Sequence, residues 1–404
     1  MEIINISQSF EIKGGSDTYF KALSALLNEH GITVKEFASS VHESEVYPKA
    51  INFDKPSLTE IVKYFYNLDA KKKLESFLSV NKFDVAHLHI YYGKLTSSIL
   101  HPLKKQGIPI VQTLHEYKIV CPTYKLYDGH ALCKDCSGNH FYKALFKKCN
   151  RDSFAKTFIS AAEAYVSLWG GSQSLIDRFI TVSDFQKRQI ADMGFKSDKI
   201  TTVHNFIDLG TYPDFYQDGE YVLFFGRIEQ VKGIDSLIDA FESLPDHMKL
   251  LIIGHGEYET EVRKRIDASP SLGKKIKILG FMNKEEISRA IHRSKFVVVP
   301  SIWYETFGLT VVEAMAHFKP VIGANIGGIT EIISEGQDGF LITPGSHTEL
   351  ADKIKLLWND ESLIKKMGIS ARQKVEQHFS PQQHFEKLNT IYRELTNSNQ
   401  LAAK

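Results

Sequence analysis

The sequence predicts an α/β protein of two domains, each built on a doubly wound parallel sheet. The first observation is length, because 404 residues exceed what one hydrophobic core usually organises and favour two domains of roughly 200 residues. The second is rhythm, because short runs rich in Ile and Val alternate with stretches of helical periodicity. The third is that these runs are apolar throughout, which indicates sheets covered by helices on both faces.

The expected strands are separated by helical patterns along most of the chain. The pattern is clearest after the first strand, where Tyr19, Phe20, Leu23 and Leu27 recur at helical spacing. In the first half, strands are expected at 2–7, 32–37, 85–90, 108–114 and 179–182. In the second half, they are expected at 221–225, 249–253, 276–279, 296–299, 321–323 and 339–341.

A polar stretch that begins at Pro213 and ends at Gly219, both of which break regular structure, separates the two series of strands. We therefore expect a Rossmann-like domain at 1–205, with a Cys-rich insertion at about 117–152, and a second one at 206–385. A last helix at 386–404 carries an apolar stripe that needs a surface to pack on.

Charge and hydropathy exclude several classes of protein. The 49 Lys and Arg balance 48 Asp and Glu, so the strong basicity of a dedicated nucleic-acid binder is missing. No basic segment precedes an apolar stretch at residue 1, and no apolar run approaches the ~18 residues of a membrane span, so we expect a cytoplasmic protein. Residues 101–150 carry eight Lys, among them Lys143, Lys147 and Lys148, against three acids. That segment is either a solvated face or a peripheral contact with an anionic membrane or a phosphorylated acceptor.

Glycines stand before a helix in the first half, at Gly14 and Gly15. Backbone N–H groups at such a place can bind a phosphate, although a tight turn requires the same glycines. The full Gly-x-Gly-x-x-Gly spacing is absent, so a nicotinamide cofactor is not supported.

Two cations occupy the equivalent place in the second half. Gly226 and Arg227 close a strand, and Lys232 and Gly233 open a helix, so the two side chains could neutralise a diphosphate. Cations beside a loop are often simply solvated. Because ligands of open α/β sheets bind at the carboxyl ends of the strands, this position favours a binding role.

The most informative segment is residues 300–314, which follow an expected strand. Glu305 stands in a strand-to-helix loop, where stabilisation by the helix dipole is a sufficient structural explanation. Glu313, two turns on, has apolar neighbours on both sides. A partly buried acid in that position suggests a hydroxyl-rich ligand.

Together these motifs resemble the retaining nucleotide-sugar glycosyltransferases of the large family four, of the bacterial polysaccharide type. That family has the GT-B fold, in which two Rossmann-like domains face a central cleft and the last helix crosses back to the first domain. The resemblance covers nearly the whole chain. Its further markers are His87-Leu88-His89, His115-Glu116, Thr181-Val182-Ser183, Asn205, Gly254-His255-Gly256, Gly280-Phe281 and Gly327-Gly328 with Glu331.

The resemblance implies that the second domain binds a nucleoside-diphosphate sugar and the first domain binds the acceptor. It assigns the donor diphosphate to Arg227 and Lys232, the donor sugar to Glu305, and a place beside that sugar to His115. Glu116 could orient His115 or contact the acceptor. The implied donor-binding residues are Gly15, Gly226, Gly256, Phe281, Met282, Thr306, Phe307, Gly308, Leu309 and, on the ribose hydroxyls, Glu313.

The implied reaction is a retaining transfer to a glycan or lipid-linked glycan, with UDP favoured over GDP as the donor nucleotide. Two cations and helix N-termini can stabilise the leaving diphosphate, so catalysis is expected to need no metal ion or other cofactor. Same-face attack, with the donor phosphate accepting the acceptor proton, needs no enzymatic nucleophile, so Glu305 is not assigned as one.

Two alternatives share these features. A non-hydrolysing sugar-nucleotide epimerase has the same architecture, but the spacing of Glu305 and Glu313 is typical of transferases. A catalytically silent nucleotide-sugar-binding subunit would be expected to lack some of the charged residues, and Arg227, Lys232 and both glutamates are present.

The four cysteines form a separate constellation in the first domain. Cys121, Cys133, Cys136 and Cys149 lie within 29 residues with the spacing C-x11-C-x2-C-x12-C. A Cys-x-x-Cys pair with two outer thiols is an arrangement used by structural zinc, and the polar segment between them has too few apolar residues to order itself. Unligated thiols are the alternative. A disulfide fits a reducing compartment poorly, and nothing else in the sequence supports an iron–sulfur cluster.

Overall fold

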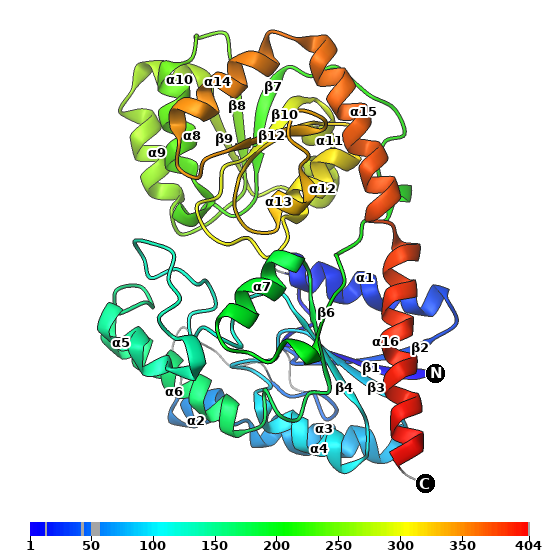
Figure 1. The fold of residues 1–404 in the computed structure, drawn as a ribbon. Helices are drawn as coiled ribbons and strands as arrows, with labels where there is room; N and C mark the ends of the chain where they lie inside the picture. The colour runs from blue at the N-terminus through cyan, green and yellow to red at the C-terminus, as the bar shows by residue number, and fades with distance from the viewer. Residues whose placement is uncertain (13, 42–43, 50–56, 403–404) are drawn as a thin grey trace. The chain divides into compact units, whose positions relative to one another are not determined.

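The computed structural model describes residues 1–12, 14–41, 44–49 and 57–402 (Figure 1). The chain forms two compact units, one of Met1–His204 together with His384–Lys404 and the other of Asn205–Gln383. The sequence placed the first division after residue 205 and the second after residue 385. In the part of the chain described, no helix is long and apolar enough to cross a membrane.

The first unit contains a six-stranded parallel sheet in the order β2-β1-β3-β4-β5-β6. Its strands are β1 (Glu2–Ser7), β2 (Thr33–Ala38), β3 (Val85–Leu88), β4 (Ile110–Leu114), β5 (Arg178–Thr181) and β6 (Ile200–Thr202). Its helices are α1 (Gly15–Glu29), α2 (Leu58–Phe65), α3 (Leu68–Val80), α4 (Leu100–Lys105), α5 (Ala144–Lys147), α6 (Phe154–Trp169) and α7 (Asp184–Asp192). Strand β6 was not predicted, because it has only three residues and two of them are Thr.

The second unit repeats this plan with the sheet order β12-β11-β10-β7-β8-β9. Its strands are β7 (Tyr221–Phe225), β8 (Leu250–Ile253), β9 (Ile276–Gly280), β10 (Ser294–Val299), β11 (Val321–Ala324) and β12 (Gly339–Ile342). Its helices are α8 (Ile234–Ser243), α9 (Glu259–Asp267), α10 (Pro270–Lys275), α11 (Lys284–His292), α12 (Leu309–Ala316), α13 (Ile329–Ile332), α14 (His347–Trp358) and α15 (Glu361–His378).

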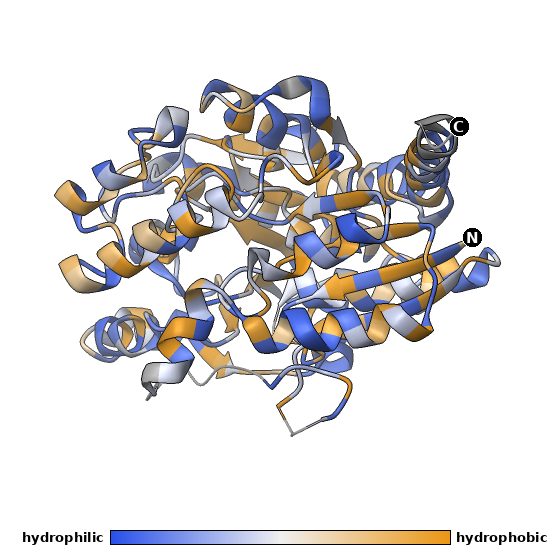
Figure 2. Cartoon of the chain, turned by 90° about the horizontal axis from the view of Figure 1, so that it is seen from below, coloured by the Kyte–Doolittle hydropathy of each residue, from blue (hydrophilic) through white to orange (hydrophobic). Residues whose placement is uncertain are grey.

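Apolar strands fill the core of the second unit, as their composition predicts. Val222 and Phe224 of β7 and Phe296 of β10 are buried against Leu237 and Phe241 of α8. Figure 2 shows hydrophobic residues concentrated in the strands, while most helices combine a hydrophobic and a hydrophilic side. Each buried aliphatic or aromatic side chain of this kind contributes about 1.5–3 kcal/mol relative to an exposed one.

The last helix, α16 (Pro381–Ala402), packs on the first unit from His384 onward. Leu388, Ile391 and Tyr392 are buried, which covers the apolar stripe of this helix. The Phe385 ring stacks on His30 of the first unit with ring centres 3.8 Å apart. Residues far apart in sequence therefore complete one core.

Candidate active site

The charged candidate site residues of the second unit, Lys232 and Glu305, lie in the loops that follow β7 and β10. These strands are neighbours in the sheet, yet β7 is followed in sequence by β8 on one side and β10 by β11 on the other. Loops that leave such a switch point diverge, and open α/β sheets bind their ligands there. The order of the strands therefore brings together Lys232 and Glu305, which are 73 residues apart.

Lys232 and Glu305 form an ion pair in which Nζ lies 2.7 Å from Oε1. Ser301 Oγ donates a hydrogen bond to the same oxygen at 2.6 Å, and Nζ also lies 5.0 Å from the ring centre of Trp303. Burial by itself would raise the pKa of Glu305. The charge of Lys232, together with hydrogen bonds from Lys232, Ser301 and Trp303, outweighs burial and holds the pKa of Glu305 below its ordinary value. Glu305 is therefore a carboxylate with a fixed orientation at neutral pH.

The two loops touch through their backbones, and glycine makes this approach feasible. Gly233 has φ 73°, and a Cβ at this position would lie 1.8 Å from the carbonyl oxygen of Pro300. The amide of Ile302 also donates to the carbonyl of Val231 at 2.9 Å. Any side chain at position 233 would push the loops apart and separate Lys232 from Glu305.

A similar contact fixes the other side of Glu305. A Cβ on Gly327, which has φ 67°, would lie 2.5 Å from the backbone nitrogen and oxygen of Glu305. The amide of Gly328 donates to the Glu305 carbonyl at 2.8 Å. The glycine pair noted in the sequence therefore supports the carboxylate loop.

Arg227 extends from the loop after β7 with 70% of its side chain exposed. One terminal nitrogen lies 2.5 Å from Oε1 of Glu229, whose own side chain is buried. A buried acid thus orients the guanidinium, while most of the group still faces solvent. Sequence reasoning missed Glu229, because nothing in the spacing distinguishes it from a solvated acid.

Helix α12 begins at Leu309 without a side-chain cap, after Gly308 with φ 110°. The first amides of such a helix have no intrahelical acceptor and carry the positive end of its dipole. Thr306 is half-buried, whereas Phe307 is buried with its ring 5.6 Å from that of Phe379. The Phe307 side chain therefore anchors the loop, and only its backbone remains a candidate for ligand contact.

Glu313 lies on α12 and is half-buried. Burial raises its pKa to about 7, and only Lys284 opposes the shift. The following helix end is fixed by His317, whose Nδ1 lies 2.8 Å from the Glu313 carbonyl oxygen. A group with this pKa is partly protonated at neutral pH, and hydrogen bonds from hydroxyl groups would favour its charged form.

The remaining residues predicted to bind the sugar donor lie just after the ends of β7, β8 and β9. Gly226 donates its amide to the Ile253 carbonyl at 3.0 Å, and Gly256 packs against the Ile228 carbonyl. Phe281 is 84% exposed, and Met282 is half-buried. An apolar ring of that exposure after a strand end offers a stacking surface.

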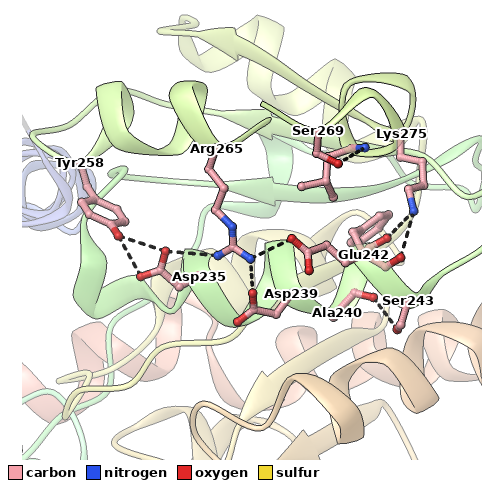
Figure 3. A network of polar contacts seen from close by, with 11 residues as sticks. Asp235, Asp239, Ala240, Glu242, Ser243, Tyr258, Arg265, Ser269 and Lys275 are labelled. Atoms are coloured by element: carbon pink, nitrogen blue, oxygen red, sulfur yellow. Dashed lines mark hydrogen bonds and ion pairs between the residues drawn. The ribbon is translucent and has the colours of Figure 1, made fainter. Parts of the chain in front are cut away.

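An ionic network braces α8, the helix that follows Lys232 (Figure 3). Arg265 of α9 contacts Asp239 and Glu242 of α8, the latter at 3.1 Å. Tyr258 Oη donates to both oxygens of Asp235 at 3.0 and 3.1 Å. The network holds the start of α8, and with it the backbone of the Lys232 loop, against α9.

In the first unit, His115 follows β4 and belongs to a chain of hydrogen bonds. The side-chain nitrogen Nδ2 of Asn5 donates to the Phe20 carbonyl and to Ser24 Oγ, which leaves Asn5 Oδ1 to accept from His89 Nε2 at 2.8 Å. His89 Nδ1 lies 3.0 Å from His115 Nε2. Burial holds the pKa of His115 at about 3 and that of His89 well below its ordinary value, so both rings are neutral.

Two further chains of hydrogen bonds join the same region to α16. In one, Tyr392 Oη lies 2.5 Å from His87 Nδ1, and His87 Nε2 lies 2.7 Å from Thr113 Oγ1. In the other, Tyr19 Oη lies 2.8 Å from His384 Nε2, and His384 Nδ1 lies 2.7 Å from the His204 carbonyl oxygen. The ring centres of Tyr19 and His115 are 5.1 Å apart. Residues of α16 therefore support the surroundings of His115.

Other predicted residues of the first unit have simpler positions. Gly15 is exposed at the first position of α1. Glu116 is half-buried, and burial raises its pKa to about 7, partly opposed by Lys118. Lys118 pairs with Glu163 at 2.6 Å, and both side chains are buried. Sequence reasoning missed this pair, because its two members are 45 positions apart on a loop and on α6.

Cys121, Cys133, Cys136 and Cys149 all line one cavity of the first unit, and none forms a disulfide. Cys121 and Cys136 are each 8% exposed. The sequence spacing thus corresponds to a cluster in space.

Two family models match the chain in succession. One, described as Glycosyltransferase Family 4, matches residues 13–211, and the other, described as Glycosyl transferases group 1, matches residues 213–374. The chain belongs to the family four glycosyltransferases. The resemblance seen in the sequence is thereby confirmed, and the two parallel sheets are those of the GT-B fold.

Relatives of this glycosyltransferase extend over most of the chain. An uncharacterized glycosyltransferase of Methanocaldococcus jannaschii is 27% identical over 358 residues, which are 88% of this chain and 88% of that protein. The capsular polysaccharide biosynthesis glycosyltransferase CapM of Staphylococcus aureus is 29% identical over 230 residues, 55% of this chain and 60% of that protein. The structure of HepE from Anabaena in complex with UDP covers 98% of this chain and 100% of that one, with a TM-score of 0.67 and 19% identity.

Proposed function

We propose that this glycosyltransferase moves a sugar from a nucleoside-diphosphate sugar to a glycan or lipid-linked glycan, with retention of anomeric configuration. The observation that carries the proposal is the Lys232–Glu305 ion pair, fixed by Ser301 and by two glycine contacts at the switch point of the second unit. A partly buried, oriented ion pair is costly to assemble for stability alone. Its position at the switch point that also carries the exposed Arg227 and the first amides of α12 suits a charged ligand.

The donor diphosphate would bind Arg227, Lys232 and the first amides of α12. Lys232 uses one of its three N–H donors on Glu305, which leaves donors for phosphate oxygens. Arg227 is oriented by Glu229 and otherwise exposed. Glu305 would then hold Lys232 in place and accept a hydrogen bond from a hydroxyl of the donor sugar, together with the amides of residues 306–309.

The nucleoside would occupy the surface between α12 and the end of β9. Glu313 would accept hydrogen bonds from the ribose hydroxyls, and the exposed ring of Phe281, with the backbone through Met282, would contact the base. UDP is our preferred nucleotide, and the UDP complex of HepE supports this choice. In the first unit, the amide of Gly15 is assigned to the diphosphate by the family resemblance.

The reaction would proceed on one face of the sugar. The bond between the anomeric carbon and the diphosphate breaks, the acceptor oxygen bonds to that carbon, and the acceptor proton passes to the departing phosphate oxygen. The two cations and the α12 amides would stabilise the growing negative charge, so no divalent ion is required. Neutral His115 would hydrogen-bond a sugar hydroxyl while positive charge develops on the ring.

A turnover assay with each candidate donor tests the proposal. The full chain is incubated with UDP- and GDP-sugars, with and without glycan acceptors, and the release of nucleoside diphosphate is measured. We expect release that depends on acceptor, and a product whose anomeric proton coupling matches that of the donor. An inverted product would overturn the retaining mechanism, and an epimerised donor without transfer would favour the epimerase.

Donor candidates can be ranked beforehand by thermal shift. A ligand at 100 times its dissociation constant adds about 2.7 kcal/mol to the stability of the state that binds it. The Glu313→Ala variant serves as a control, because nucleotide should stabilise it less than the unmodified protein while the variant keeps its fold.

A further inference from the structure

The segment between β4 and α6 contains all four cysteines and little regular structure. Between residues 115 and 153, the described elements are two short 3-10 turns and the four-residue helix α5. Six of the eight non-glycine residues with positive φ in the described part of the chain lie here, namely Tyr124, Leu126, Asn139, Lys148, Arg151 and Asp152. Such backbone conformations are unfavourable and persist only where surrounding contacts impose them.

The sulfur atoms of the segment share one cavity with a few apolar residues. The cavity lined by Cys121, Cys133, Cys136 and Cys149 is completed chiefly by Leu126, Ala144, Met193 and nearby loop residues. The four thiols are thus gathered around one space inside the segment, although they are up to 28 positions apart in the sequence. From this placement we infer that the four thiols bind one structural zinc ion, which holds the segment in its fold.

The groups around the sulfur atoms suit thiolates. Lys147 Nζ lies 3.5 Å from Cys133 Sγ, and the backbone N–H of Ala144 donates to the Cys136 sulfur. N–H donors of this kind stabilise metal-bound thiolates. Lys147 is itself fixed by Asp128 at 2.9 Å and Asp135 at 3.0 Å.

Zinc binding would also tighten the segment. In the described part of the chain, no three of the four cysteine sulfur atoms all lie within 4.8 Å of one another. Ligands of a tetrahedral site with Zn–S bonds of about 2.3 Å lie about 3.8 Å apart. The loop must therefore move inward on binding, which predicts that zinc protects residues 115–153 from proteolysis.

Metal content tests this inference directly. The full chain, purified without chelator, should contain one zinc per chain by mass spectrometry, and Cys133→Ser with Cys136→Ser should remove it. His140→Ala is the matched control, because His140 is exposed in the same segment and should be dispensable. Zinc at a small fraction of one per chain, retention of zinc by the double cysteine variant, or iron in place of zinc would overturn the inference.

A second measurement on the unmodified chain covers the case in which the cysteine variant does not fold. The protein is stripped with chelator under reducing conditions and then given Co²⁺ alone. We expect the charge-transfer and visible bands of tetrahedral thiolate cobalt, together with lower reactivity of the thiols toward a disulfide reagent. Octahedral cobalt spectra with four freely reactive thiols would contradict a four-cysteine site.

Discussion

His89 Nδ1 accepts a hydrogen bond from His115 Nε2 across 3.0 Å, and this contact determines which nitrogen of His115 carries the proton. The direction follows from Asn5, whose Oδ1 can only accept, so His89 Nε2 must be the donor there. Neutral His89 then presents Nδ1 as an acceptor, and neutral His115 must place its proton on Nε2. Nδ1 of His115 is consequently an acceptor, suited to a sugar hydroxyl.

Asn5→Leu should lower turnover by weakening this orientation. Loss of one neutral hydrogen bond contributes about 1 kcal/mol, which corresponds to roughly fivefold in rate. Ser24→Ala is the matched control, because it removes another partner of Asn5 and leaves the contact with His89. Steady-state kinetics on both variants, with thermal unfolding to compare stability, measure the effect. Equal turnover in the two variants would remove the positioning role.

Protonation of His115 should not lower the turnover number between pH 5 and 8. Burial lowers the pKa of His115 to about 3, so its charge does not change in that window. The pH profiles of wild type and His115→Asn should therefore have the same shape and differ in height. A limb near 6.5 in the wild type that vanishes in the variant would show that His115 titrates.

Nucleotide affinity should rise with pH around 7. Burial raises the pKa of Glu313 to about 7, so the carboxylate is mostly protonated below that pH and mostly charged above it. Between pH 4.5, the ordinary pKa of Glu, and pH 7, Glu313 keeps its proton in the folded state but loses it in the unfolded state. Glu313 therefore lowers the free energy of unfolding of the ligand-free protein as the pH rises through this window. Calorimetric titration with UDP at pH 6 and 8 checks the affinity, and Glu313→Gln should abolish its pH dependence.

The same titration with Glu313→Ala should show weaker binding by roughly 1.5–3 kcal/mol, the range for hydrogen bonds to a charged group. Unchanged affinity in a folded Glu313→Ala protein would reject the ribose contact.

Lys232→Ala should lower turnover more than it lowers the affinity for uridine, because negative charge on the diphosphate grows in the transition state. It should also destabilise the fold by up to about 3 kcal/mol, since Glu305 is left buried without its partner. Lys295→Ala is a matched control, because Lys295 also pairs with an acid, Glu361 at 3.0 Å, and also lies near a Trp ring, that of Trp358 at 5.5 Å. Lys295 differs from Lys232 in its position, at the end of β10 opposite to the candidate site. A proportional loss of uridine binding in Lys232→Ala would argue for a general structural defect.

The basic segment of the first unit should favour anionic vesicles if it contacts a membrane. Phe141 is buried, whereas Phe146 is 82% exposed beside Lys147 and Lys148. Lys143→Gln with Lys148→Gln should reduce cosedimentation at low salt, and a control pair on the second unit, Lys264→Gln with Lys277→Gln, should not. At physiological salt, screening should reduce the difference in cosedimentation between the unmodified protein and the Lys143→Gln, Lys148→Gln variant. Identical sedimentation of all three proteins would reject the membrane contact.

The strands were the most predictable part of this protein, because continuous runs such as residues 250–253 can be buried only in a covered sheet. The positions of Lys232 and Glu305 after strands were also visible. Their ion pair was not, because it depends on the reversal of strand order between β7 and β10. His87 and His89 were recognised as markers, but their hydrogen bonds to Tyr392 and Asn5 required the path of α16 and the register of β1.

The return of α16 has a consequence for synthesis on the ribosome. The unit that begins at Met1 acquires His384 and Tyr392 only after the intervening residues have been translated. At about 5–20 residues per second, the 200 residues from 205 to 404 take about 10–40 s. During that interval Tyr19 and His87 lack their partners on α16, whereas the second unit has its whole sequence as soon as residue 383 is translated, before α16 is complete. The half translated first is therefore expected to mature last, and a nascent-chain chaperone would find its exposed surface where α16 later packs.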